Sequence, residues 1–254
     1  MRKILYAICI IAIVFSMTSC KKEPVQTDVG LQSKTAADSP HWQKIVAKNE
    51  LKIGVPSTEN SFYNELIDAF AKELDIPVTK ISADGDFKKL LEDGTIDMYW
   101  GLYPKEAPDS FDFTFSTPYV TTTAVLLTLA DNTEAADTKN NVIGVVKNSA
   151  EALLAAGKYE NIKTYDSVKE LWTALGYGNV NCIMMNNCDY ESSDYFSSDK
   201  FRVQDTAMYN LVIAFKDGYT DLAAETDKTL AKIKASGVAS EICEKWYGKD
   251  LISK

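Results

Sequence analysis

The sequence contains a single histidine, His41, and no serine or cysteine motif accompanies it. A nucleophilic triad needs a histidine base held against its nucleophile, so the chain offers no candidate for triad catalysis. His41 precedes the first expected structural element, and we expect it to be solvated. We expect a protein that is not an enzyme and that holds no cofactor.

Cysteine is also scarce, with five among 254 residues. No CxxC pair and no cluster of cysteine with histidine occurs, so a zinc site is not expected. Cys9 and Cys20 lie in the first 20 residues, and Cys182, Cys188 and Cys243 lie in the remainder. Three cysteines argue against a full disulfide framework. Cys182 and Cys188 could pair, or these cysteines could be small buried residues.

Positive charge is in short supply, because 27 Lys and Arg face 36 Asp and Glu, for a formal net charge of −9 at pH 7. Such a chain repels phosphate backbones, so we exclude nucleic acid as a partner. After residue 20 no apolar run approaches the length of about 18 residues that a membrane span needs. The remaining chain is long enough for one large domain or two lobes.

The first 20 residues have the pattern of an export signal. A basic start, Met1-Arg2-Lys3, precedes an apolar stretch at residues 4–17 that is too short to be a membrane span. Thr18-Ser19-Cys20 then resembles the lipobox of bacterial lipoproteins, in which the signal is removed and the cysteine is acylated. We therefore expect a signal peptide at residues 1–19 and a lipid anchor on Cys20, with a plain secretory signal as the alternative.

Residues 20–40 are rich in Lys, Thr, Ser, Asp and Pro and have no apolar period. This composition predicts a flexible, lipidated tether. The protein would be exported and held by its lipid on the bacterial cell envelope, either in the periplasm or on the outer face of the cytoplasmic membrane.

Beyond residue 40 the hydrophobic pattern alternates between the periods of strands and helices. In the first hundred residues it predicts helices at 42–48, 62–74 and 86–91, the last capped by Asp86, and strands at 51–55 and 96–100. Further on it predicts strands at 142–146 and 182–185, a helix to residue 156 capped by Asn148 or Ser149, a helix opened by the capping box Ser167-x-x-Glu170, and two C-terminal helices.

Strands that alternate with helices predict parallel sheets with crossover helices, and hence an α/β fold of two lobes. Ligands of such folds bind outside the carboxyl ends of the strands. Those ends fall at residues 56–62, 100–103, 147–150 and 186–187. If the lobes face each other, these four loops converge on one cleft.

Four stretches are informative together: NELKIGV at 49–55, LEDGTID at 91–97, FSTPY at 115–119 and EKWYG at 244–248. In this order and spacing they resemble the bacterial extracellular solute-binding proteins of the polar amino-acid type, family 3. The resemblance covers about residues 42–250. It implies a type II periplasmic-binding-protein-like clamp that captures a small polar solute, an amino acid or a similar molecule, for the permease of an ABC uptake transporter.

The family pattern also implies the domain boundaries. Lobe 1 would comprise residues 41–118 and 211–254, and lobe 2 would comprise residues 124–205. Two hinge segments, 119–123 and 206–210, would join the lobes. We expect a monomer, anchored to the membrane through its lipid.

The sequence departs from the family at both ends of the usual amino-acid clamp. Typical members hold the α-carboxylate with an arginine, yet the aligned stretch Ala107-Pro108-Asp109-Ser110 has none, and the ammonium-binding aspartate aligns with Asn186. Lys105 or backbone amides at Ser149-Ala150 could replace the arginine. We therefore expect weak binding of most α-amino acids, and a ligand that is less zwitterionic or stacks on aromatic rings.

The ligand-binding residues that we expect come from loops and strand ends, and none is expected to bind a metal. They are Phe62, Tyr103, Lys105, Ser110, Ser149, Ala150 and Asn186. For Tyr99 and Trp100 core packing is the main expectation. We interpret Glu151 as a charge at a helix N-terminus.

Two other functions stay open on the sequence. The same fold serves as a ligand-sensing module, which would need a separate signalling partner. It also hosts dehydratases that act on a prephenate-like acid, for which Glu59, Asp84, Asp86 and Lys105 are the available acid, base and charged groups.

Overall fold

The computed structural model describes residues 40–56, 61–83, 86–132, 140–196 and 198–253. The predicted signal peptide, the lipid anchor on Cys20 and residues 20–39 of the predicted tether lie outside these ranges. Glu59 and Asp84, two of the acids considered for an enzyme, also lie outside them. Within the described ranges no helix combines the length and the apolar character that crossing a membrane requires.

The first sheet contains five strands: β1 (Leu51–Val55), β2 (Val78–Ser82), β3 (Met98–Tyr99), β4 (Phe113–Phe115) and β10 (Ala214–Lys216). Their order is β2-β1-β3-β10-β4. β1 pairs in parallel with β2 and β3, whereas β10 pairs antiparallel with β3 and β4. The predicted strand at 96–100 is therefore present but shorter, and the predicted parallel core of the sheet is confirmed.

The helices that accompany the first sheet are α1 (Pro40–Lys48), α2 (Phe62–Leu74), α3 (Phe87–Glu92), α7 (Thr220–Ala235) and α8 (Val238–Tyr247). α2 packs against α7 and α8, and α1 packs against α7. Asp86 caps α3 by accepting a hydrogen bond from the Lys89 N–H, as the sequence predicted. A short 3-10 helix, Ser110–Asp112, precedes β4.

The second sheet contains β5 (Val120–Leu129), β6 (Val142–Val146), β7 (Asn161–Tyr165), β8 (Cys182–Asn186) and β9 (Phe201–Leu211), in the order β7-β6-β8-β5-β9. β6 pairs in parallel with β7 and β8, and β5 pairs antiparallel with β8 and β9. Its helices are α4 (Ala150–Ala156), α5 (Val168–Gly176) and α6 (Asn187–Glu191). The predicted α/β fold with two sheets is confirmed.

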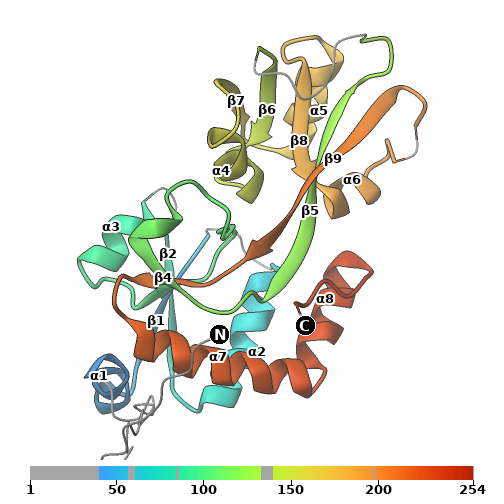
Figure 1. Ribbon diagram of the computed structural model, residues 1–254. Helices are drawn as coiled ribbons and strands as arrows, with labels where there is room; N and C mark the ends of the chain where they lie inside the picture. Colours follow the sequence, from blue (N-terminus) through green and yellow to red (C-terminus); the bar gives the residue numbers. More distant parts are fainter. Residues whose placement is uncertain (1–39, 57–60, 84–85, 133–139, 197, 254) are drawn as a thin grey trace, which may run out of the picture. The chain divides into compact units, whose positions relative to one another are not determined.

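A long antiparallel ribbon of β5 and β9 leads the chain into the second sheet and back (Figure 1). Its pairing runs from Val120 opposite Leu211 to Leu129 opposite Phe201, with one irregularity between Ala124 and Val125. Side chains alternate along a strand, so Val120 and Thr122 face one side and Thr121 and Thr123 the other. Residues 120–123 lie at the start of β5 and residues 206–210 lie near the end of β9, and a hinge at these segments stays a prediction.

Aromatic side chains fill the core beneath α2. Phe70 is 1% exposed and meets Trp100 edge-on, with 5.1 Å between ring centroids. Tyr119 lies against Trp100 and donates a hydrogen bond of 2.8 Å to the Gly101 carbonyl oxygen. Tyr99 and Trp100 are both buried, so the expectation of core packing is confirmed. Cys182, Cys188 and Cys243 are buried, and none of them forms a disulfide with another described residue.

The structure corrects the expectation for His41. Its backbone N–H and that of Trp42 donate hydrogen bonds of 3.0 and 2.8 Å to one oxygen of Asp221. Its ring nitrogen Nδ1 lies 3.1 Å from the other oxygen, and the ring stacks on Tyr219 at 3.8 Å. His41 is thus half-buried and fixes the start of α1 to α7, which the sequence pattern around one residue did not reveal.

Candidate functional site

A cavity of about 620 Å³ lies between residues of the two sheets. Pro56, Phe62 and Tyr63 line it from the end of β1 and the start of α2, and α4, α6 and β8 line it from the second sheet. The β5–β9 ribbon contributes Thr122 and Tyr209. Its volume falls in the range of about 300–1,000 Å³ that is usual for small-molecule sites.

Two polar residues that cap helices line the cavity on the side of the second sheet. Ser149 follows β6 and caps α4, accepting a hydrogen bond from the Ala152 N–H at 3.1 Å. Asn186 ends β8 and caps α6, with its side-chain oxygen accepting from the Cys188 N–H at 2.8 Å. Because β6 and β8 are parallel neighbours, their carboxyl ends bring both caps to one edge of the sheet. Both line the cavity, as does Phe62.

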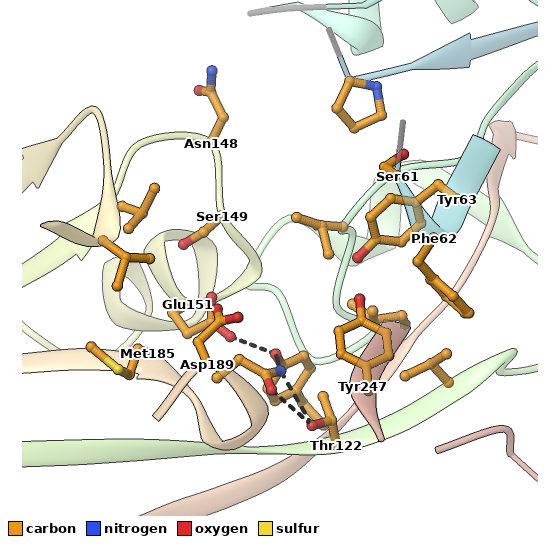
Figure 2. A pocket seen from close by; sticks show the side chains of 18 of the residues that line it. Ser61, Phe62, Tyr63, Thr122, Asn148, Ser149, Glu151, Met185, Asp189 and Tyr247 are labelled. Atoms are coloured by element: carbon orange, nitrogen blue, oxygen red, sulfur yellow. Dashed lines mark hydrogen bonds between the residues drawn. The ribbon is translucent and has the colours of Figure 1, made fainter. Parts of the chain in front are cut away.

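A buried polar network lies behind the caps (Figure 2). The Tyr209 hydroxyl donates to the Glu151 carboxylate at 2.5 Å, and the Asn186 side-chain amide donates to the Tyr209 hydroxyl at 2.7 Å. Asn186 also exchanges hydrogen bonds with the Thr122 hydroxyl at 3.2–3.3 Å. Glu151, Thr122 and Tyr209 are all buried. The network joins α4, α6 and the ribbon at the cavity wall.

Glu151 and Asp189 are the two carboxylates closest to this network, and Figure 2 shows them side by side at the cavity. Burial raises the pKa of Glu151, although hydrogen bonds from Tyr209, Ser149 and Asn186 oppose the rise. Partial removal of the Asp189 carboxylate from water, together with the negative charge of Glu151, raises the pKa of Asp189 to about 6. The Asp189 side chain is exposed to the water of the cavity, so its charge is open to an incoming molecule.

Aromatic side chains form the opposite wall. Phe62 lies edge-on to Tyr63 and to Tyr247, with centroid distances of 5.4 and 5.2 Å. Burial raises the pKa of both Tyr63 and Tyr247. Trp246 also lines the cavity and is 39% exposed. This wall offers ring faces and hydroxyls to an organic molecule.

The other expected site residues lie elsewhere. Ala150 is fully buried beside Ser149 and is not a lining residue. Tyr103 is buried in the core between Phe87 and Phe115, and its hydroxyl donates to the Asp109 carboxylate at 2.7 Å. Tyr103 was expected at the cavity because the sequence places it in a loop after a strand, and this position does not reveal the packing.

Lys105 and Ser110 also lie away from the cavity lining. Lys105 is exposed, and its backbone N–H donates to the Asn210 carbonyl oxygen at 2.8 Å. Ser110 begins the 3-10 helix before β4. The stretch that aligns with the family arginine therefore contributes no cationic side chain to the cavity lining.

The lining residues missed as site residues include Glu151, Asp189 and Tyr247. Asp189 lies three residues after the cap Asn186, at a position where a short helix presents an acid beside its cap, and this spacing was a usable signal. Nothing local indicates that Glu151 is buried, because its partner Tyr209 is 58 residues away. No group of three metal-ligating side chains occurs in the described ranges.

Comparison with known proteins finds solute-binding proteins that are similar to this chain. L-cystine-binding protein TcyA of Bacillus subtilis is 24% identical over 255 residues, covering 87% of this chain and 90% of the relative. A substrate-binding protein of an ABC uptake transporter from Streptococcus pneumoniae, with bound histidine, superposes with a TM-score of 0.69 at 19% identity, covering 84% of this chain and 98% of that one.

An ancestral amino acid-binding protein, described as a precursor of cyclohexadienyl dehydratase, superposes with a TM-score of 0.64 at 18% identity, covering 81% of this chain and 98% of that one. These superpositions show the two-lobe fold of type II binding proteins. The sequence model of one protein family matches residues 61–249, which is well over half of the chain. The chain therefore belongs to the bacterial extracellular solute-binding proteins, family 3.

Proposed function

We propose that the protein captures a small organic solute in the cavity between its two sheets and presents it to the permease of an ABC uptake transporter. The cavity itself carries this proposal, because its volume suits a small molecule and polar groups from both sheets line it. The relatives named above are binding proteins, one for cystine and one with bound histidine.

Capture would use the two lobes as a clamp. We propose lobes at 41–118 with 211–254 and at 124–205, joined by hinge segments at 119–123 and 206–210, and the pairing of β5 with β9 supports this division. Contacts at the C-terminus link both sides of the cavity, since Lys249 forms an ion pair with Glu191 of α6. A ligand that contacts both sides binds the closed state better and shifts the population toward it.

Native mass spectrometry of the freshly purified protein tests the capture of a solute. We expect a bound small molecule that is lost on unfolding and refolding. Adding that molecule back at saturation should reduce the radius of gyration in small-angle X-ray scattering. A solute-free protein that no metabolite extract compacts would contradict the proposed function.

We also propose that a lipid on Cys20 anchors the protein to the cell envelope. The basic start, the apolar stretch and Thr18-Ser19-Cys20 support this proposal. Acyl chains anchor a protein through the CH₂ groups that they bury, at about 0.8 kcal/mol each.

Replacing Cys20 with Ser should move the protein from the membrane fraction to the soluble fraction of the cell. Cys9→Ser, in the apolar stretch, is the matched control and should leave the protein with the membranes. Fractionation followed by immunoblotting measures both. Membrane association of Cys20→Ser equal to that of the original protein would show that the anchor is assigned wrongly.

A further inference from the structure

The charges of the cavity lining are predominantly negative. Glu151, Asp166 and Asp189 line it, and among the described lining residues Lys147 is the one with a basic side chain. Glu151 is nine-tenths buried, and its orientation is fixed by the Tyr209 hydroxyl. A low-dielectric cavity focuses the field of such carboxylates on whatever molecule enters it. The cavity therefore attracts a cation.

The same lining is poorly suited to a carboxylate. The described part of the lining includes no arginine that could hold a carboxylate with two parallel hydrogen bonds. The first turn of α4, next to Ser149, already contains the chain's own Glu151. A ligand carboxylate placed there would approach a like charge in a site of low dielectric, which is unfavourable. Both features count against a zwitterion.

Asp189 is available to a ligand. Among the described residues no donor forms a hydrogen bond or ion pair with its carboxylate, although it lies beside Glu151 at the cavity (Figure 2). Glu151, in contrast, already accepts from Tyr209. Together they provide one fixed and one unpaired carboxylate for the hydrogens of an ammonium group.

The aromatic wall opposite Glu151 and Asp189 indicates what the rest of the ligand is like. Phe62, Tyr63, Trp246 and Tyr247 present ring surfaces, and Met184 and Met185 add polarisable apolar surface on the side of the second sheet. Ring faces attract cations as well as apolar groups. The wall therefore fits a molecule whose hydrocarbon or aromatic part extends away from its charged end.

We propose that the solute is a small organic amine whose ammonium group lies between Glu151 and Asp189 and which needs no carboxylate for recognition. This inference rests on the proposed function, because it names the chemical class of the captured solute. It also makes the sequence-based expectation of a less zwitterionic ligand more specific, because it is the carboxylate that the ligand would lack.

Pairs of compounds that differ by one carboxylate test it. We would titrate the full chain by calorimetry at pH 7.5 with agmatine and arginine, cadaverine and lysine, and phenethylamine and phenylalanine. In the pair that binds, the amine should bind at least tenfold more tightly than its parent amino acid. Glu151→Gln and Asp189→Asn should each weaken the amine at least tenfold, a factor that corresponds to about 1.4 kcal/mol.

The matched controls make the same acid-to-amide substitution at residues that do not line the cavity. Glu160→Gln and Asp194→Asn remove exposed acids that do not line the cavity and should leave amine binding unchanged. Lys147→Ala is not a control, because it removes a positive charge from the cavity lining, and it should tighten amine binding. Circular dichroism and thermal melting of each variant confirm folding, and Asp189→Asn, at an exposed side chain, provides a test even if Glu151→Gln fails to fold.

The pH dependence provides a second readout. Lowering the pH from 7.5 to 5 protonates Asp189, with its pKa of about 6, and should weaken amine binding about tenfold. Glu151, Tyr209, Tyr247 and Cys188 are the titratable groups around Asp189. In Asp189→Asn this pH dependence should be largely lost.

The outcomes separate the two proposals. Tighter binding of the amino acids, lost on Lys147→Ala but not on Asp189→Asn, would overturn the amine inference and leave the proposed function intact. A co-purified anionic solute would do the same. If no amine, amino acid or metabolite binds, both proposals fail.

Discussion

Replacing Tyr209 with Phe should destabilise the protein by about 1–3 kcal/mol, the usual cost of leaving buried polar groups without a partner. The hydroxyl donates to Glu151 and accepts from Asn186, so its removal affects both. The loss should be larger at pH 8 than at pH 5. Without the hydroxyl the pKa of the buried Glu151 rises further, and a raised carboxyl pKa in the folded state costs stability as the pH increases through it.

Urea unfolding at both pH values measures this effect. Tyr177→Phe, the same substitution at a side chain that is 81% exposed, is the control and should change stability by less than about 0.5 kcal/mol. An equal loss at both pH values would mean that Tyr209 supports packing alone and does not stabilise the Glu151 carboxylate.

Replacing Phe70 with Ala should cost about 3–5 kcal/mol, the range for removing a large aromatic side chain from a packed core. Phe70 is 1% exposed and its ring meets Trp100, so the substitution leaves a cavity beneath α2. Lys72→Ala, on the exposed side of the same helix, is the control for helix propensity. Thermal and urea unfolding measure both variants.

A loss below about 1 kcal/mol for Phe70→Ala would show that the region beneath α2 collapses around the deleted ring. In that case the core of the first sheet would be far more adaptable than its edge-on aromatic contacts indicate. A similar loss for Lys72→Ala would instead trace the effect to the helix rather than to the core.

The elements of the fold were predictable where local chemistry decides them. Asp86, Ser149 and Ser167 cap α3, α4 and α5 as expected, because a capping side chain needs only the amides of the next turn. In the capping box, Glu170 reaches back to the Asp166 N–H, one residue earlier than the ideal pattern. Strand and helix periods located most of the remaining elements in the same way.

The cavity was predictable only in part. Asn186 and Ser149 reach it because strand ends share an edge of the sheet, which sequence order reveals. Glu151 was interpreted as a helix charge, because its burial depends on Tyr209 of a distant strand. Tyr103 was expected at the cavity, yet Phe87, Phe115 and Asp109 hold it in the core. Long-range packing decided each of these cases.

The alternation of the β5–β9 ribbon limits how the recognition of solutes can change. Val120 and Thr122 line the cavity, whereas their neighbours Thr121 and Thr123 do not. Inserting or deleting one residue at the start of β5 would turn the lining side chains to the other face. New ligand preferences can therefore arise on this wall by exchanging side chains at every second position, but not by changes in its length.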